Sequence, residues 1–254
     1  MIEVKQLGKV YPGKVTDQPL TDVNFRVEEG EMVAVMGPSG SGKSTLINLL
    51  ATLDEPSWGS ILIDGIDTAT FKRKEMTRFR RETLGIIFQE FNLLDSLTLG
   101  ENMLVPLMLS GKKAKLAREE MEGLARRLQI DDLLDKQVDE VSGGQRQRTA
   151  IGRALIHTPR LMLADEPTGA LDFQATKHVM DVLAELNATG MTMVIVTHDP
   201  QVASYCNHVL FLKDGSVQTE LFRDEPRRVF FQRVIESLSL LGGDEHQLSA
   251  IRPT

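Results

Sequence analysis

The architecture of this chain follows from one loop, Gly37-Pro38-Ser39-Gly40-Ser41-Gly42-Lys43-Ser44-Thr45. The loop matches the pattern G-x-x-x-x-G-K-[ST], in which glycines let successive backbone N–H groups turn toward a bound phosphate. The lysine of this pattern reaches the β- and γ-phosphates of a nucleotide, and the hydroxyl of the next residue ligates Mg²⁺. The sequence therefore predicts a nucleotide-phosphate site, with Lys43 on the phosphates and Ser44 on the metal.

The residues on either side of the loop indicate a strand before it and a helix after it. The apolar run 32–36 precedes the loop, and the apolar run 46–50 follows it. A helix that begins at the loop adds the positive end of its dipole to the phosphate site. The plainer interpretation, an ordinary glycine-rich turn between a strand and a helix, leaves Lys43 without a role.

Composition places the chain among globular proteins that bury a sizeable core. Of its 254 residues 41% are apolar and 26% are charged, and the net charge of −7 argues against a surface that coats nucleic acid. The single cysteine, Cys206, excludes an internal disulfide framework and is typical of a reducing compartment. The sequence has neither a run of 18 apolar residues nor a signal-peptide pattern, so we expect it to reach a membrane only through a partner.

Short apolar runs alternate with amphipathic segments along the chain, which predicts an α/β fold. Four runs are typical of buried strands: residues 32–36, 84–88, 161–164 and 191–197. Such runs indicate a mainly parallel sheet covered on both faces. The alternating segments 2–5 and 23–27 predict an antiparallel β subdomain at the N-terminus. Helical patterns replace strand patterns from about 90 to 155, which predicts a helical subdomain inserted in the core.

Two acidic residues follow the apolar run 161–164 directly. Ligands in open α/β sheets bind at the carboxyl ends of strands, so we expect Asp165 and Glu166 beside the phosphate loop. A phosphate loop needs such partners, because Mg²⁺ must be held and an attacking water must be oriented. We predict that Asp165 holds Mg²⁺ and that Glu166 is the general base. The alternative is an acidic strand end exposed to solvent.

A third motif, Val141-Ser142-Gly143-Gly144-Gln145, precedes a helical pattern. Ser142 is a suitable helix N-cap, and the two glycines leave backbone N–H groups open to an anion. Taken alone, this motif predicts either a second, weaker phosphate site or merely a capped helix.

The set of motifs resembles the nucleotide-binding subunit of ABC transporters over essentially the whole chain, with the S-G-G-Q signature as its decisive part. The resemblance implies a P-loop NTPase core that hydrolyses ATP with Mg²⁺. It implies an ATPase domain at residues 1–224, containing the helical subdomain, and a C-terminal amphipathic helix and tail at 225–254. A GTPase would need the guanine-reading pattern Asn-Lys-x-Asp, which is absent, and S-G-G-Q has no role in a kinase.

Four single residues take roles by the same resemblance. Tyr11 matches an aromatic that stacks on adenine, although a packed tyrosine is an equally simple interpretation. Gln89 matches a glutamine that contacts Mg²⁺ and the attacking water and links the site to the membrane partner. Asp172 matches a residue of the loop that communicates between subunits, and His198 matches the histidine on the γ-phosphate. Ala170, where the family usually has serine, departs from the pattern.

The resemblance also implies a homodimer. In the family, the signature of one subunit closes over the γ-phosphate bound to the loop of the other, in a two-fold arrangement. We therefore expect Ser142, Gly143, Gly144 and Gln145 to complete the nucleotide site of a second copy.

Residues 80–94 look like the subgroup that includes macrolide-exporter, lipoprotein-releasing and cell-division ATPases. Within it, the chain is most similar to bacitracin-type antimicrobial-peptide resistance ATPases, in segment 164–172 and, more discriminatingly, in 197–200 with 203–206 and in 230–232 with 241–243. That resemblance implies a separate integral-membrane permease, a sensor kinase reached through the permease, and a peripheral place on the cytoplasmic face of the membrane, without nucleic acid. The alternatives are lipoprotein release, macrolide export or cell division. A soluble ABC ATPase acting on ribosomes or DNA generally carries tandem cassettes or a long coiled-coil insertion, and the sequence has neither.

The C-terminal segment from Arg227 carries apolar residues at helical spacing, including Phe230 and Val234. Two interpretations stay open: a helix folded on its own domain, or a docking surface for the permease or a second subunit.

Overall fold

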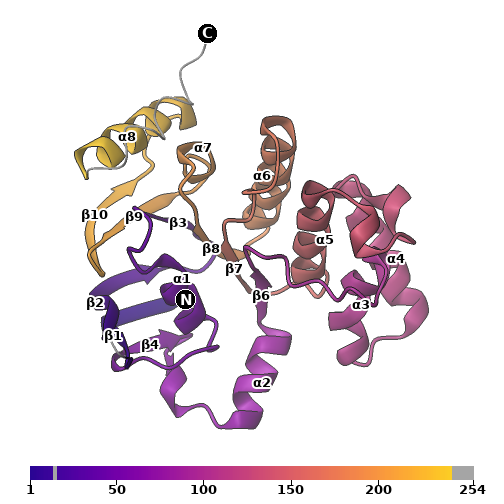
Figure 1. Ribbon diagram of the computed structural model, residues 1–254, viewed down its shortest axis with the longest axis horizontal. Coiled ribbons are helices and arrows are strands. Elements are labelled where there is room, and N and C mark those ends of the chain that lie inside the picture. Colours follow the sequence, from indigo (N-terminus) through magenta and orange to yellow (C-terminus); the bar gives the residue numbers. More distant parts are fainter. Residues whose placement is uncertain (14–15, 242–254) are drawn as a thin grey trace. The chain divides into compact units, whose positions relative to one another are not determined.

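The computed structural model describes residues 1–13 and 16–241 and divides into two compact units (Figure 1). The first unit comprises Met1–Phe71 and Val194–Thr254, and the second comprises Lys72–Met193. Strand β8 (Thr192–Val196), in which the boundary falls, is buried at every residue. Among the residues described, no helix has both the length and the apolar character needed to cross a bilayer.

The first unit is built on a mixed sheet. The predicted antiparallel pair at the N-terminus is confirmed, and both strands run further than their alternating patterns indicated. The strand order is β5-β4-β1-β2-β10-β9-β3, in which β9 pairs parallel with β3 and antiparallel with β10. The strands are β1 (Ile2–Tyr11), β2 (Asp17–Val27), β3 (Met32–Met36), β4 (Trp58–Ile63), β5 (Ile66–Asp67), β9 (His208–Lys213) and β10 (Ser216–Phe222).

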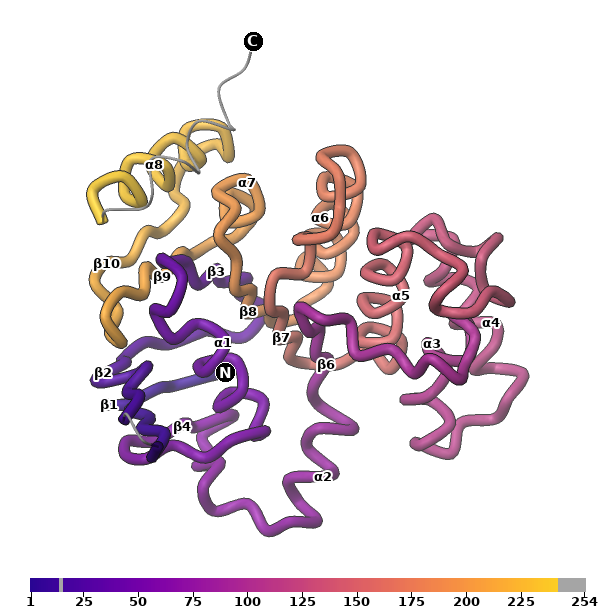
Figure 2. The backbone as a smooth tube through the Cα atoms, in the orientation of Figure 1, coloured from indigo at the N-terminus to yellow at the C-terminus, as the bar shows by residue number. Residues whose placement is uncertain are grey.

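The described residues of the first unit form the α-helices α1 (Lys43–Leu50), α7 (Pro200–Ala203) and α8 (Arg227–Leu240). Phe230 and Val234 of α8 are fully buried, and the Arg227 guanidinium lies over the Tyr205 ring, 4.0 Å from its centroid. The apolar stripe of the C-terminal segment therefore packs on its own unit, beside α7 (Figure 2). This arrangement favours the first of the two interpretations of that segment.

The second unit combines two parallel strands with five helices. β6 (Leu84–Ile87) pairs with β7 (Leu161–Asp165), so that Ile87 lies opposite Ala164. The chain between these strands forms helices, and α3, α4 and α5 lie side by side (Figures 1 and 2). The helices are α2 (Arg73–Glu82), α3 (Leu99–Leu109), α4 (Ala114–Arg127), α5 (Gly143–Leu155) and α6 (Phe173–Ala188). The predicted limits of the helical subdomain stay a prediction.

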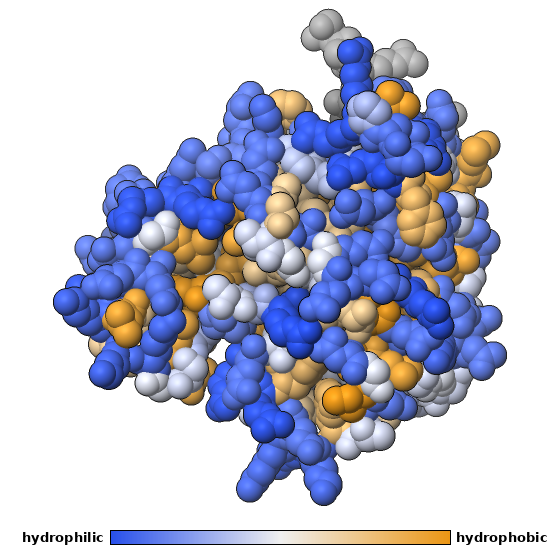
Figure 3. Space-filling view, turned by 180° about the vertical axis from the view of Figure 1, so that it is seen from behind, coloured by the Kyte–Doolittle hydropathy of each residue, from blue (hydrophilic) through white to orange (hydrophobic). Residues whose placement is uncertain are grey.

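Helix α2 differs from the other helices of the second unit in that none of its residues is buried. It carries Arg80 and Arg81 in its last turn and Glu75 in its first, which is the charge distribution that a helix dipole favours. Figure 3 shows a hydrophilic surface where α2 lies. The Lys72 N–H also donates to Glu75 Oε2 at 2.8 Å, so charge placement and this cap, rather than burial, account for the helix.

Cys206 is fully buried, and burial raises the pKa of its thiol to about 12. The thiolate is the reactive form of cysteine, so a raised pKa leaves very little reactive thiolate at pH 8. We expect no reaction of the folded protein with Ellman's reagent at pH 8 and release of one thiol per chain after unfolding in guanidinium. Release within seconds from the folded protein would contradict this burial.

Candidate nucleotide site

The phosphate loop lies between β3 and α1, the positions that the sequence predicts for it. Gly42, which precedes α1, has φ of 97°, and a Cβ there would lie 2.4 Å from the Pro19 carbonyl oxygen. A Cβ on Gly37 would lie 2.0 Å from the Leu212 carbonyl oxygen. Both positions therefore require glycine, because the neighbouring groups are backbone that cannot turn aside. The loop is held from both sides by other strands of its own unit.

The side chains of the loop fit a bound polyphosphate. The Lys43 ammonium donates hydrogen bonds to the carbonyl oxygens of Gly37, at 2.9 Å, and Pro38, at 2.8 Å, so it lies across the loop. Ser41 is buried, and its Oγ has no hydrogen-bond partner among the residues described. A Cβ on Gly40 would meet no described atom within 4 Å. A cationic amine, a buried hydroxyl and open space at the loop suit a group rich in acceptor oxygens.

Tyr11 and His198 belong to the same unit as the loop. Tyr11 ends β1 and is exposed, with its hydroxyl donating to Asp54 Oδ2 at 2.7 Å, so it is not the packed tyrosine of the simpler interpretation. His198 follows β8 and is also exposed. The preceding Thr197 donates its N–H to the Val35 carbonyl at 3.1 Å. His198 therefore lies at the carboxyl end of β3, where the phosphate loop begins.

The acidic pair and Gln89 follow two neighbouring strands of the second unit. Asp165 is the last residue of β7, and Glu166 follows it with φ of 50°, the left-handed region that costs a non-glycine residue energy. Since Ile87 of β6 lies opposite Ala164 of β7, the chain that leaves β6 toward Gln89 emerges beside the acidic pair. The strands thus bring these three predicted residues to the same carboxyl end of the sheet.

The signature residues open helix α5. Ser142 is its N-cap: its Oγ accepts from the Gln145 N–H at 3.3 Å, and Gln145 Oε1 accepts from the Ser142 N–H at 2.9 Å. This reciprocal capping box confirms the predicted cap and adds Gln145 to it. A Cβ on Gly144 would lie 3.4 Å from the Ala170 carbonyl, so the signature lies beside the loop that leads to Asp172. Asp172 in turn caps α6 by accepting from the Ala175 N–H at 2.8 Å.

Arg153 of α5 holds the segment after Gln89. Its guanidinium donates to the carbonyls of Phe91, at 2.7 Å, and Asn92, and both of these residues have left-handed φ. Burial lowers the pKa of the Arg153 guanidinium. The two carbonyl oxygens accept hydrogen bonds from it at this buried position. The sequence pattern gave no signal for this contact, because it joins residues about sixty positions apart.

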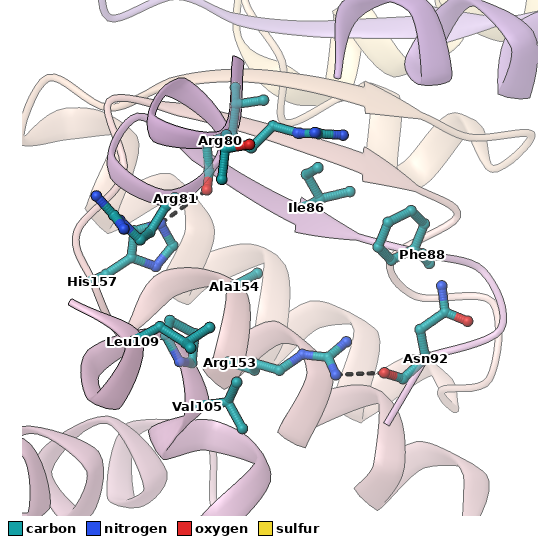
Figure 4. A pocket seen from close by; sticks show the side chains of 13 residues that line it. Arg80, Arg81, Ile86, Phe88, Asn92, Val105, Leu109, Arg153, Ala154 and His157 are labelled. Carbon is teal, nitrogen blue, oxygen red and sulfur yellow. Dashed lines mark hydrogen bonds between the residues drawn. The ribbon is translucent and has the colours of Figure 1, made fainter. Parts of the chain in front are cut away.

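Beside this segment lies a pocket of about 630 Å³ (Figure 4). Figure 4 shows Arg153 pointing toward Asn92 on one side of the pocket and Arg81 near His157 on the other. His157 contacts the Leu84 carbonyl at 2.9 Å, and burial lowers the pKa of its imidazole. The pocket is lined by Thr77, Arg80, Arg81, Leu84, Ile86, Phe88, Asn92, Val105, Pro106, Leu109, Arg153, Ala154 and His157.

Comparisons with known proteins agree with this geometry. The family model described as "ABC transporter" matches residues 20–169. The ABC transporter ATP-binding protein YxdL of Bacillus subtilis is 51% identical, over 99% of this chain and 98% of its own length. The bacitracin export ATP-binding protein BceA of Halalkalibacterium halodurans is 45% identical, over 96% of this chain and 97% of its own length.

A solved structure shares the fold. The dimeric post-hydrolysis form of the ATP-binding cassette MJ0796, bound to ADP and Pi, matches with a TM-score of 0.84 and 38% identity, over 87% of this chain and 98% of that one. This match confirms the predicted α/β fold with a P-loop NTPase core. Because the family model covers more than half of the chain and the relatives span nearly all of it, the chain is an ATP-binding, ATP-hydrolysing protein of the ABC transporter family.

Proposed function

We propose that two copies of this chain close around two ATP molecules and drive a separate integral-membrane permease. The observation that carries this proposal is the signature at the start of α5, a helix of 13 residues whose N-terminal N–H groups and dipole favour an anion. Ser142 is exposed there, within reach of another molecule. The dimeric cassette that shares the fold supports the same arrangement.

The residues that would hold the nucleotide divide by chemistry. Lys43 and the backbone N–H groups of the loop face the phosphates, and Tyr11 faces the base. Ser44, Gln89 and Asp165 offer the oxygen ligands that Mg²⁺ prefers. When bound, Mg²⁺ neutralises charge on the β- and γ-phosphates.

Hydrolysis requires a base and a partner for the γ-phosphate. In our proposal the Glu166 carboxylate orients the attacking water and accepts its proton, and His198 hydrogen-bonds the γ-phosphate. The signature of the other copy covers the same phosphate. ATP then favours the closed dimer because it contacts both copies, and loss of the γ-phosphate removes that preference.

The pocket beside Asn92 is the surface where we expect the permease to bind. Its wall includes apolar side chains such as Ile86, Val105 and Leu109, while Arg80 and Arg81 add positive charge (Figure 4). This combination fits an amphipathic helix with an acidic side chain. Arg153 joins the pocket to the backbone that follows Gln89, so a helix bound there has a mechanical connection to the nucleotide site.

A charge in this pocket is expected to uncouple the chain from its permease. Leu109→Glu replaces a side chain that is 68% exposed, so the fold is retained. We expect co-purification with the permease to fall at least about tenfold, because a bound helix must desolvate the new carboxylate, which also competes with the acidic side chain of that helix for Arg80 and Arg81. ATP hydrolysis by the isolated chain should not change. The matched control is Leu116→Glu, 49% exposed on α4 and outside the pocket. Equal co-purification of Leu109→Glu and the control would contradict this docking site.

The finer function that we propose is resistance to, or sensing of, bacitracin-like peptide antibiotics. Similarity to the bacitracin export protein BceA supports it. In this assignment the chain lies on the cytoplasmic face of the membrane through its permease, and the permease also contacts a sensor kinase. Lipoprotein release, macrolide export and cell division are the alternatives within the same subgroup.

Co-expression with a permease of the bacitracin-exporter type tests this assignment. In a bacitracin-sensitive bacterium we expect the pair to raise the minimal inhibitory concentration of bacitracin, and the pair with Glu166→Gln to leave it at the level of the empty vector. Equal growth inhibition with the active and inactive pairs would contradict the peptide-antibiotic role. A change in macrolide resistance alone would favour the export branch.

A further inference from the structure

We propose that Asp54 and Lys9 are positioning residues that hold the Tyr11 ring as the platform on which the nucleotide base stacks. The inference rests on the proposed function, in which Tyr11 faces the base. All three residues belong to the first unit: Lys9 and Tyr11 lie in β1, and Asp54 follows α1, two elements labelled in Figures 1 and 2. No sequence motif includes Asp54 or Lys9.

One carboxylate fixes both neighbours. Asp54 Oδ2 accepts from the Tyr11 hydroxyl at 2.7 Å, and Asp54 Oδ1 accepts from the Lys9 ammonium at 2.6 Å. Lys9 also donates to the Glu55 carbonyl at 2.7 Å and is only 9% exposed, so its amine is held in place. A buried lysine with two short, charge-assisted hydrogen bonds is a rigid support rather than a solvated surface charge.

The Tyr11 ring is supported on one face and exposed elsewhere. The Lys9 ammonium lies over the ring, 4.8 Å from its centroid, a cation–π contact. The tyrosine side chain nevertheless remains 36% exposed. A ring held by a cation from one side and open to solvent is ready to stack on a flat ligand, and base stacking on an aromatic ring is worth about 1–3 kcal/mol.

The segment 54–57, which contains Asp54, connects the Tyr11 ring to the phosphate loop through α1. Asp54 follows α1, the helix that begins at Lys43, and Ser57 joins the segment to β1 through hydrogen bonds with Val10 and Gly8. The Thr45 side chain also acts on the Tyr11 phenol, where it lowers the pKa. The distance between the base platform and the phosphate site is therefore set by one short, well-bonded segment.

The pKa values of Tyr11 and Asp54 determine which group donates and which accepts in their hydrogen bond. Burial raises the pKa of the Tyr11 phenol, and the hydrogen bond with Asp54 raises it further. Burial acts to raise the pKa of Asp54 as well, but the hydrogen bonds from Lys9 and Tyr11 outweigh it, so the pKa of Asp54 is lowered. At neutral pH the phenol is thus the donor and the carboxylate the acceptor.

The test is to compare ligands with and without a base. In Asp54→Ala we expect the affinity for ATP to fall about tenfold, because the ring is no longer held for stacking. Affinity for inorganic tripolyphosphate, which has no base, should stay unchanged. GTP should lose as much affinity as ATP, because stacking depends on the face of the base and not on its edge. An equal loss for tripolyphosphate, or no loss for ATP, would overturn the proposal.

Milder variants keep the test informative if Asp54→Ala unfolds. Asp54→Asn retains an acceptor for the Tyr11 hydroxyl and should recover part of the ATP affinity. Tyr11→Phe retains the ring without its tether and should lose less affinity than Tyr11→Ala. In the Tyr11→Ala background, Asp54→Asn should cause no further loss, because its effect passes through the ring. Additive losses in that double variant would show that Asp54 acts elsewhere. Asp132→Ala, an exposed residue of the second unit, is the matched control.

Failure of the inference and failure of the proposed function give different results. If Tyr11→Ala weakens ATP binding and neither Asp54 variant does, the positioning role is wrong and the proposed function stands. If the wild-type chain binds ATP no more tightly than tripolyphosphate, the base has no platform and the inference falls. If the wild-type chain binds no nucleotide, the proposed function falls with it.

Discussion

Replacing Lys43 with alanine is expected to abolish tight ATP binding. The Lys43 ammonium is the cation that lies across the phosphate loop, where it contacts the carbonyl oxygens of Gly37 and Pro38. Hydrogen bonds to charged groups are worth about 1.5–3 kcal/mol each, so losing the contacts to two phosphates is expected to weaken binding at least about 100-fold. Titration calorimetry with ATP and Mg²⁺ measures this loss.

Alanine at this position leaves the scaffold intact, because Lys43 is the first residue of α1 and alanine favours helix. The matched control is Lys115→Ala, an exposed lysine on α4. It should bind ATP as the wild type does. A Lys43→Ala protein with wild-type affinity for ATP would remove this lysine from the phosphate site.

Replacing Glu166 with glutamine is expected to stop hydrolysis while ATP still binds. Glutamine has the shape of glutamate but cannot accept a proton from water. A positioned general base contributes about 10²–10⁴-fold to rate, and the single-turnover rate of phosphate release should fall by that factor. Glutamine also meets the same backbone strain at φ of 50°, so the local fold should not change.

A remote carboxylate makes this test specific. Glu119→Gln, exposed on α4, should hydrolyse ATP at the wild-type rate. If Glu166→Gln retains turnover within about threefold of the wild type, Glu166 is not the base.

The local parts of the site could be predicted from the sequence. The phosphate loop, its strand and its helix are contiguous, and glycine and lysine spacing specifies them directly. The carboxylates that follow β7 were predicted because a buried apolar run ends where ligands bind in α/β sheets. The cap at Ser142 could be predicted because helix capping depends on residues that are neighbours in the sequence.

Contacts between distant segments could not be predicted. Asp54 accepts hydrogen bonds from Lys9 and Tyr11, which lie more than forty residues away in the sequence. No sequence pattern around Asp54 predicts these hydrogen bonds. Arg153 reaches the carbonyls after Gln89 across about sixty residues, where only packing of α5 brings them together. The part that Gln145 takes in capping α5, unlike these distant contacts, could have been predicted. The S-x-x-Q spacing is a capping-box pattern, so a local signal was available for it.

The mass of the Glu166→Gln protein with ATP and Mg²⁺ tests most directly whether two copies close around two nucleotides. Light scattering after size exclusion should give twice the 28.3 kDa of one chain, with one ATP bound per chain. Adding Ser142→Arg should return the protein to a single-chain mass, because the larger side chain blocks the signature while the phosphate loop still binds ATP. A single-chain mass for Glu166→Gln at saturating ATP would contradict the shared site.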